Sequence, residues 1–149
     1  MRRSLLVGII CGLLATGAYD LTRYSIVEVT NFTFWPFDIF TIFGQALIGT
    51  ENDGPFVTTA GIVYHLANGI GFSIAYTVLL GRRGVWAGVL WAMILETLMV
   101  SVYPGWLELK ALDEFLQVSV LGHLAYGCVL GFTARFLLTW NEGAWHGRT

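Results

Sequence analysis

Four long apolar stretches, each interrupted by only one or two ionisable residues, alternate with short polar segments along the chain. The hydrocarbon core of a bilayer is about 30 Å thick, so a helix that crosses it needs about 20 residues. The four stretches meet or nearly meet this length, at about 4–26, 55–81, 84–107 and 115–140. The pattern therefore predicts an all-α membrane protein with four transmembrane helices.

A further apolar segment lies between the first two predicted spans, at residues 32–49. It is too short to cross the membrane and return as a helix. Pro36 suits a first helical turn and Gly49 suits a C-terminal cap. We therefore expect a helix from about Pro36 to Ile48 that is re-entrant or lies at the outer face of the membrane; a short fifth span is the alternative.

Composition supports a membrane protein and excludes several other classes. Of the 149 residues 56% are hydrophobic and only 12% are charged, which is too few charges to cover a water-soluble surface. The net charge of -2 gives no basic patch for nucleic acid. Cys11 and Cys128 lie inside apolar runs, so they do not form a disulfide framework. We expect one integral membrane domain over residues 1–149.

Basic residues indicate which side of the membrane each end of the chain faces. With four spans, one side receives nearly all the arginines and the other receives most of the acidic loop residues, with Lys110 as its lone cation. The arginines are Arg2, Arg3, Arg82, Arg83, Arg135 and Arg148. Because lysine and arginine favour the cytoplasmic side, both termini are expected in the cytoplasm.

Two parts of the sequence recur at fixed spacings. The pattern Gly-x-x-x-Gly followed eight residues later by a carboxylate occurs twice, and so does the pattern His-Leu-Ala-x-Gly. The first pattern comprises Gly8, Gly12 and Asp20, then Gly84, Gly88 and Glu96; the second begins at His65 and again at His123. We expect two parallel-repeat hairpins, about 4–81 and 84–140, related by an axis along the membrane normal, with the four glycines allowing close helix packing.

Four ionisable residues of these patterns are candidate site residues: Asp20, His65, Glu96 and His123. At about 1.5 Å per residue, all four fall at overlapping depth in the outer half of the bilayer. Ionisable groups at this depth are costly unless they are paired, so we expect them to meet inside the bundle.

Three interpretations of this polar cluster remain open. Each histidine could bond one carboxylate and so join the hairpins. The four groups could hold a transition metal, or the two histidines could be the axial ligands of a haem. The cluster could also lie on a proton or ion path. Around it, Arg23, Tyr24, Asn68 and Tyr126 are candidates for supporting hydrogen bonds, and Arg23 is expected to pair with Asp20.

Several short segments carry a resemblance to a known family. They are Tyr64–His65, Phe72–Tyr76, Trp86–Leu90, Pro104, Asp113–Phe115 and Gly122–Leu124. Together they resemble small bacterial inner-membrane proteins of the YagU type, over roughly the second to fourth spans. The resemblance implies a multi-pass protein of the bacterial inner membrane and carries no biochemical activity.

The sequence thus predicts a small binding or accessory protein of the inner membrane. It favours a non-enzymatic role over an enzymatic one, and a metal ion is among the candidate ligands. One alternative is a haem or metal redox subunit of a larger membrane complex. Another is a small proton or ion transporter. The expected partners are the lipid bilayer and either a second copy of the chain or a larger membrane complex, and not nucleic acid.

Overall fold

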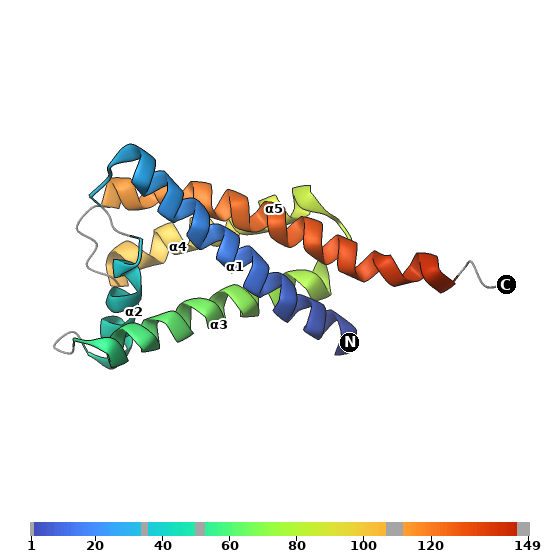
Figure 1. Cartoon of the computed structure of the whole chain (residues 1–149), viewed down its shortest axis with the longest axis horizontal. Coiled ribbons are helices and arrows are strands. Elements are labelled where there is room, and N and C mark those ends of the chain that lie inside the picture. The colour runs from blue at the N-terminus through green and yellow to red at the C-terminus, as the bar shows by residue number, and fades with distance from the viewer. Residues whose placement is uncertain (1, 34–35, 50–52, 107–111, 146–149) are drawn as a thin grey trace.

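A computed structural model describes residues 2–33, 36–49, 53–106 and 112–145 of the chain. Helices make up most of this described part, short turns join some of them, and it contains no strands. The five helices are α1 (Arg2–Thr30), α2 (Asp38–Ile48), α3 (Pro55–Leu79), α4 (Val85–Trp106) and α5 (Leu112–Trp145). Figure 1 shows the four long helices running along a common direction, with α2 at the end of the bundle where α1 finishes and α3 begins.

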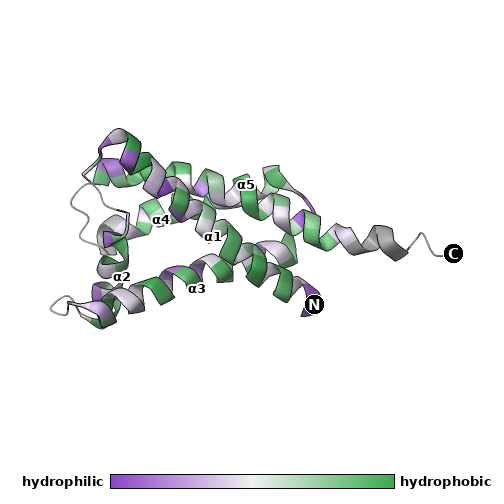
Figure 2. Cartoon of the chain, in the orientation of Figure 1, coloured by the Kyte–Doolittle hydropathy of each residue, from purple (hydrophilic) through white to green (hydrophobic). Residues whose placement is uncertain are grey.

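Helices α1, α3, α4 and α5 are each long and apolar enough to cross a membrane. Their large apolar side chains are widely exposed, as for Leu14, Leu90 and Phe132, whereas Arg23 and Glu96 are buried. Figure 2 shows hydrophobic residues distributed along the long helices. This distribution is the one expected where lipid surrounds the bundle, because polar groups in lipid must be satisfied inside the protein.

Two of the long helices, α1 and α5, extend beyond the spans that the sequence predicts. Helix α1 continues past residue 26 to Thr30 and ends at Asn31, whose φ of 55° and backbone bond to the Val27 carbonyl form a left-handed cap. Helix α5 begins at Leu112 and runs to Trp145, beyond both predicted limits. The hydropathy pattern marks the edge of the hydrocarbon, whereas a helix continues until its backbone hydrogen bonds are interrupted.

The long helices pack in the order α3, α1, α5, α4, and α2 packs on α3. Glycines bring the backbones together at two of these contacts. Gly12 of α1 lies against Ile70 of α3, and Gly88 of α4 lies against Gly131 of α5. Small residues allow such close approach between membrane helices, where lipid is as apolar as the side chains. The helix pair α3 and α4 is not among those that pack extensively.

Helix α2 begins at Asp38 and not at Pro36, so the prediction for its start is wrong by two residues. Pro36 instead precedes the helix, and its carbonyl accepts a hydrogen bond from Arg23. The C-terminal cap at Gly49 is confirmed, since this residue has a φ of 119° that favours glycine. Gly44 of α2 and Gly61 of α3 lie so close to the facing helix backbone that neither position has room for a Cβ atom.

Candidate functional site

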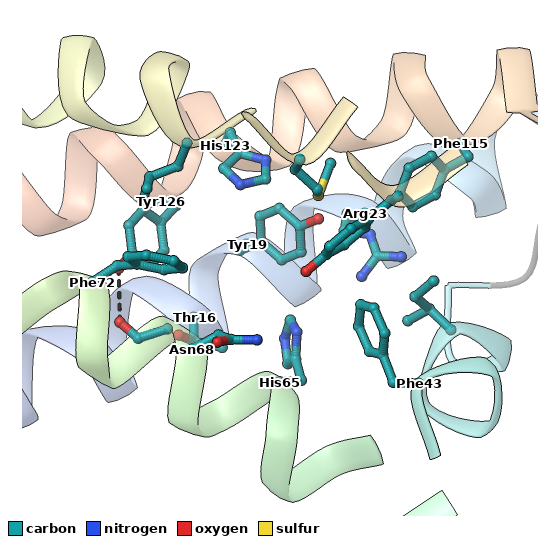
Figure 3. Close-up of a pocket in the computed structure, with 15 residues that line it drawn as sticks. Thr16, Tyr19, Arg23, Phe43, His65, Asn68, Phe72, Phe115, His123 and Tyr126 are labelled. Carbon is teal, nitrogen blue, oxygen red and sulfur yellow. Dashed lines mark hydrogen bonds between the residues drawn. The ribbon is translucent and has the colours of Figure 1, made fainter. Parts of the chain in front are cut away.

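A cavity of about 90 Å³ lies toward the end of the bundle where α2 packs, lined by residues of all five helices. This volume holds a few water molecules or a small chemical group. Its polar lining residues are Thr16, Tyr19, Arg23, His65, Asn68, Tyr103, His123 and Tyr126 (Figure 3). Its apolar lining includes Ile39, Phe43, Phe72, Leu95, Met99 and Phe115. The cavity therefore combines aromatic walls with several hydrogen-bonding groups.

The first two site residues form what we call the aspartate pair, Asp20 of α1 with His65 of α3. The Nε2 atom of His65 lies 3.1 Å from each carboxylate oxygen of Asp20. The Nη1 atom of Arg23 lies 3.6 Å from Oδ1 of the same carboxylate, and the arginine is 1% exposed. A partly buried carboxylate with both a cationic and an imidazole partner has its charge compensated locally.

The other two form the glutamate pair, Glu96 of α4 with His123 of α5. Here Nδ1 of His123 lies 2.7 Å from Oε2 of Glu96 and 3.1 Å from the backbone carbonyl oxygen of Ser119. Ser119 also donates from its hydroxyl to Oε2 of Glu96, at 2.9 Å. Because Nδ1 faces two acceptors, we assign the proton to it, which leaves Nε2 as an acceptor in the neutral ring.

The aromatic ring of Tyr19 lies between the two pairs. Its centroid is 5.8 Å from the ring of His65 and 4.9 Å from the ring of His123, in an edge-on arrangement with the latter. The guanidinium carbon of Arg23 lies 5.0 Å from the same centroid, a cation–π distance. The Tyr19 hydroxyl is 3.4 Å from the hydroxyl of Ser119. Tyr19 thus contacts both pairs.

Sequence reasoning did not single out Tyr19 or Ser119. A signal for each was present, because Tyr19 precedes Asp20 and Ser119 stands one helical turn before His123. Residues four apart share a helix face, so Ser119 could have been placed beside His123. No comparable rule assigns adjacent residues such as Tyr19 and Asp20 to one site.

Of the four residues expected to support the site, the structure brings Arg23, Asn68 and Tyr126 to the cavity. Tyr126 donates from its hydroxyl to the Gly69 carbonyl at 2.8 Å, which joins α5 to α3. Tyr24 is not in this group: it is exposed, and its ring lies 6.1 Å from that of Phe37. Successive positions on a helix point in different directions, so residues at similar depth do not necessarily share a face.

The two pairs do not merge into one ligand set. Within the described ranges, no three histidine, cysteine or acidic side chains gather closely enough to hold a metal ion. The Tyr19 ring occupies the space between the two imidazoles, where a haem with two histidine ligands would need its macrocycle. The geometry consequently favours two separate carboxylate–histidine pairs facing a common cavity.

Comparison of the chain with protein families, curated proteins and solved structures finds no match. The resemblance to proteins of the YagU type rests on short segments and stays a prediction.

Proposed function

We propose that this chain is a small multi-pass membrane protein that binds a small hydrogen-bonding molecule in its cavity. The observation that carries the proposal is the pair of imidazoles that line this cavity, each oriented by a carboxylate. A carboxylate that holds one ring nitrogen of a histidine fixes the tautomer and directs the other nitrogen to a ligand. Among the described residues, that other nitrogen has no partner in either histidine.

The free-energy cost of placing charged side chains inside a membrane indicates that the site has a role beyond packing. Asp20, Arg23 and Glu96 would each be expensive at this depth without partners, and such residues usually mark a functional site. Thr16 adds a buried hydroxyl at the cavity wall that has no hydrogen-bond partner among the described residues. Unsatisfied buried donors are uncommon, and a bound molecule would satisfy this one.

Binding is favoured over a proton or ion path because the charged and histidine side chains of the site do not continue along the bundle. The core beyond the site contains Cys11, Ala15, Leu130, Ala134 and Leu138, and its buried hydroxyl groups belong to Ser73, Tyr76 and Thr77. Between the site and the arginines at the other end of the bundle, the long helices carry no acidic, basic or histidine residue. Proton relays in membrane proteins are usually built from acidic and histidine side chains, so this region favours a closed binding site over a path.

The proposed internal repeat explains why two carboxylate–histidine pairs face the same cavity. Gly12 faces Gly69 in the first hairpin, and the residues at the same repeat positions, Gly88 and Gly127, face each other in the second. The aspartate and glutamate pairs also occupy equivalent positions. These matched contacts support two parallel-repeat hairpins, about 4–81 and 84–140, in which each hairpin contributes one carboxylate–histidine pair.

The two proposed repeats differ in how their helices pack around the cavity. Helices α1 and α5 pack tightly, yet their repeat counterparts, α4 and α3, do not. Helix α2 belongs to the outer segment that only the first repeat contains. We infer that α2 is an interfacial helix that fills the outer end of this gap.

We place the protein in the bacterial inner membrane with both termini in the cytoplasm. In support, Arg3, Arg82 and Arg83 surround one hollow of the surface, so the start of the chain and the turn between α3 and α4 share one end of the bundle. Arginines favour the cytoplasmic side. A second copy of the chain or a larger membrane complex remains the predicted partner.

Binding of 2-fluoroethanol, a small molecule that donates and accepts hydrogen bonds, tests the proposal when it is followed by fluorine NMR with the protein in lipid nanodiscs. We expect saturable binding to the wild type and to the control Leu90→Trp, whose position is exposed to lipid. Asn68→Trp and Met99→Trp add bulk at the cavity wall and should each weaken binding at least tenfold. Absence of saturable binding to the wild type, or equal binding to all four proteins, would refute the proposal.

A further inference from the structure

A second hollow lies at the opposite end of the bundle from α2, where α1 begins and α3 turns toward α4 (Figure 1). Its volume is about 410 Å³, within the range of about 300–1,000 Å³ that ligand sites occupy. Its polar lining residues are Arg3, Ser4, Thr77, Arg82 and Arg83. The hollow and the cavity have no lining residue in common, so a ligand here is independent of the proposed function.

The charge around this hollow favours an anion. Three arginines line it. The segments that form this end of the bundle, residues 1–10, 73–90 and 130–141, contain no acidic residue, and Glu142 directly follows the last of them. The carbonyl groups at the C-terminus of α3 oppose an anion, but a helix end carries only about half a unit of charge. Three guanidinium groups outweigh it.

Arg3 is held in place and still has donors for a ligand. Its Nη2 atom lies 2.9 Å from the carbonyl oxygen of Leu137 and 3.1 Å from that of Leu138, which joins α1 to α5. A guanidinium group carries five N–H donors in a rigid fork, so the Nε and Nη1 donors remain for another acceptor. Phosphate oxygens suit this fork, because such hydrogen bonds are charge-assisted and can form in parallel pairs.

A buried hydroxyl group at the wall of the hollow has no partner. Thr77 lines the hollow and is 3% exposed, and its Oγ1 atom makes no hydrogen bond to the described residues. Other threonines in these helices, such as Thr59 and Thr133, bond to the carbonyl oxygen one turn earlier. Because buried polar groups are nearly always paired, this hydroxyl indicates a ligand. The placement of arginines at a membrane surface does not explain it.

The lining of the hollow also includes apolar side chains that face outward. Val78 and Leu79 line it and are 51% and 69% exposed. The candidate spans of α1 and α3 reach Arg2 and Leu79, so the hollow lies at the level where lipid head groups meet the hydrocarbon. A molecule that matches both parts of this lining has an anionic head and an apolar tail.

We propose that the hollow binds the phosphate group of one anionic phospholipid, with Arg3, Arg83 and Thr77 as donors and with its acyl chains against Val78 and Leu79. Basic pockets between transmembrane helices bind such head groups. A zwitterionic phospholipid carries the same phosphate group, but its ammonium group would meet the arginines. The hollow should therefore distinguish the two head groups when the acyl chains are identical.

Native mass spectrometry of the full chain in neutral detergent tests the lipid class. The probes are phosphatidylglycerol and phosphatidylcholine, both with dioleoyl chains. The wild type should bind one phosphatidylglycerol molecule with a Kd at least tenfold lower than that for phosphatidylcholine. Equal Kd values for the two lipids would overturn the proposal, even if every variant failed to fold.

Matched variants separate a defined site from general attraction by positive charge. Arg83→Gln and Arg135→Gln remove the same charge at the same end of the bundle, but Arg135 lies beside Gly84 and does not line the hollow. Arg83→Gln and the isosteric Thr77→Val should each weaken phosphatidylglycerol binding at least threefold, whereas Arg135→Gln and Thr77→Ser should bind it as the wild type does. Equal weakening by both arginine variants, with Thr77→Val unchanged, would show diffuse attraction only and refute the site.

Inorganic phosphate distinguishes a lipid from a soluble anion. Replacing ammonium acetate by ammonium phosphate at constant ionic strength should leave the lipid bound, because the soluble anion makes no contact with Val78 or Leu79. Displacement of the lipid by phosphate would show that the hollow takes the soluble anion, and the assignment to a phospholipid would be wrong.

Discussion

Double-mutant cycles on the two carboxylate–histidine pairs measure whether they are separate. The substitutions are Glu96→Leu and His123→Phe within one pair, Asp20→Leu and His65→Phe within the other, and the mixed combination of Glu96→Leu with His65→Phe. Each replacement puts an apolar side chain in place of the polar one and so removes the hydrogen bond. The quantity of interest is the coupling free energy, which is the amount by which the destabilisation of the double mutant falls short of the sum of the two single effects.

The glutamate pair should show the larger coupling because it is shorter and more buried. Its two atoms are 2.7 Å apart and the Glu96 side chain is 6% exposed, whereas the aspartate pair spans 3.1 Å and the Asp20 side chain is 24% exposed. Measured couplings between polar side chains in membranes reach about 1.7 kcal/mol. We therefore expect about 1.5 kcal/mol for the glutamate pair, about 0.5–1 kcal/mol for the aspartate pair, and less than either for the mixed combination.

The assay is reversible unfolding of the purified protein in mixed micelles, followed by circular dichroism as the fraction of denaturing detergent rises. A single four-ligand cluster would couple Glu96 to His65 as strongly as to His123. Mixed coupling as large as the coupling within a pair would therefore refute the description of two separate pairs. Coupling near zero within both pairs would show that neither hydrogen bond contributes to stability.

Three further predictions concern packing, hydrogen bonding and topology. Gly127→Ala places a Cβ atom 2.7 Å from the Val89 Cα atom of α4 and should lower the free energy of unfolding by about 1–3 kcal/mol, while Gly71→Ala, which meets no atom within 4 Å, should be neutral or slightly stabilising in the same assay. Tyr126→Phe removes the bond from α5 to α3 and should cost about 1 kcal/mol; an unchanged unfolding midpoint would contradict this. Reporter fusions should be active on the cytoplasmic side at Gly84 and on the outer side at Asp53, and the reverse pattern would overturn the proposed orientation.

The membrane environment of the protein and the number of its long helices could be predicted from the sequence. A bilayer accepts only segments of a certain length and hydropathy, so the pattern of apolar residues is sufficient to locate four candidate spans. The end of α2 could also be predicted from the sequence, because glycine readily adopts the positive φ that Gly49 has as the cap of this helix. The helix limits at Thr30 and Leu112 were less predictable, because hydropathy changes at the membrane surface while the helix continues.

The partners within the site were decided by tertiary structure. Sequence places Asp20, His65, Glu96 and His123 at similar depth, but depth is one coordinate, and the rotation and order of the helices supply the others. Because α1 packs on α3 and α4 packs on α5, each carboxylate meets the histidine of its own hairpin. The same rotations turn Tyr19 into the site and Tyr24 out of it, a choice that depends on contacts between distant segments of the chain.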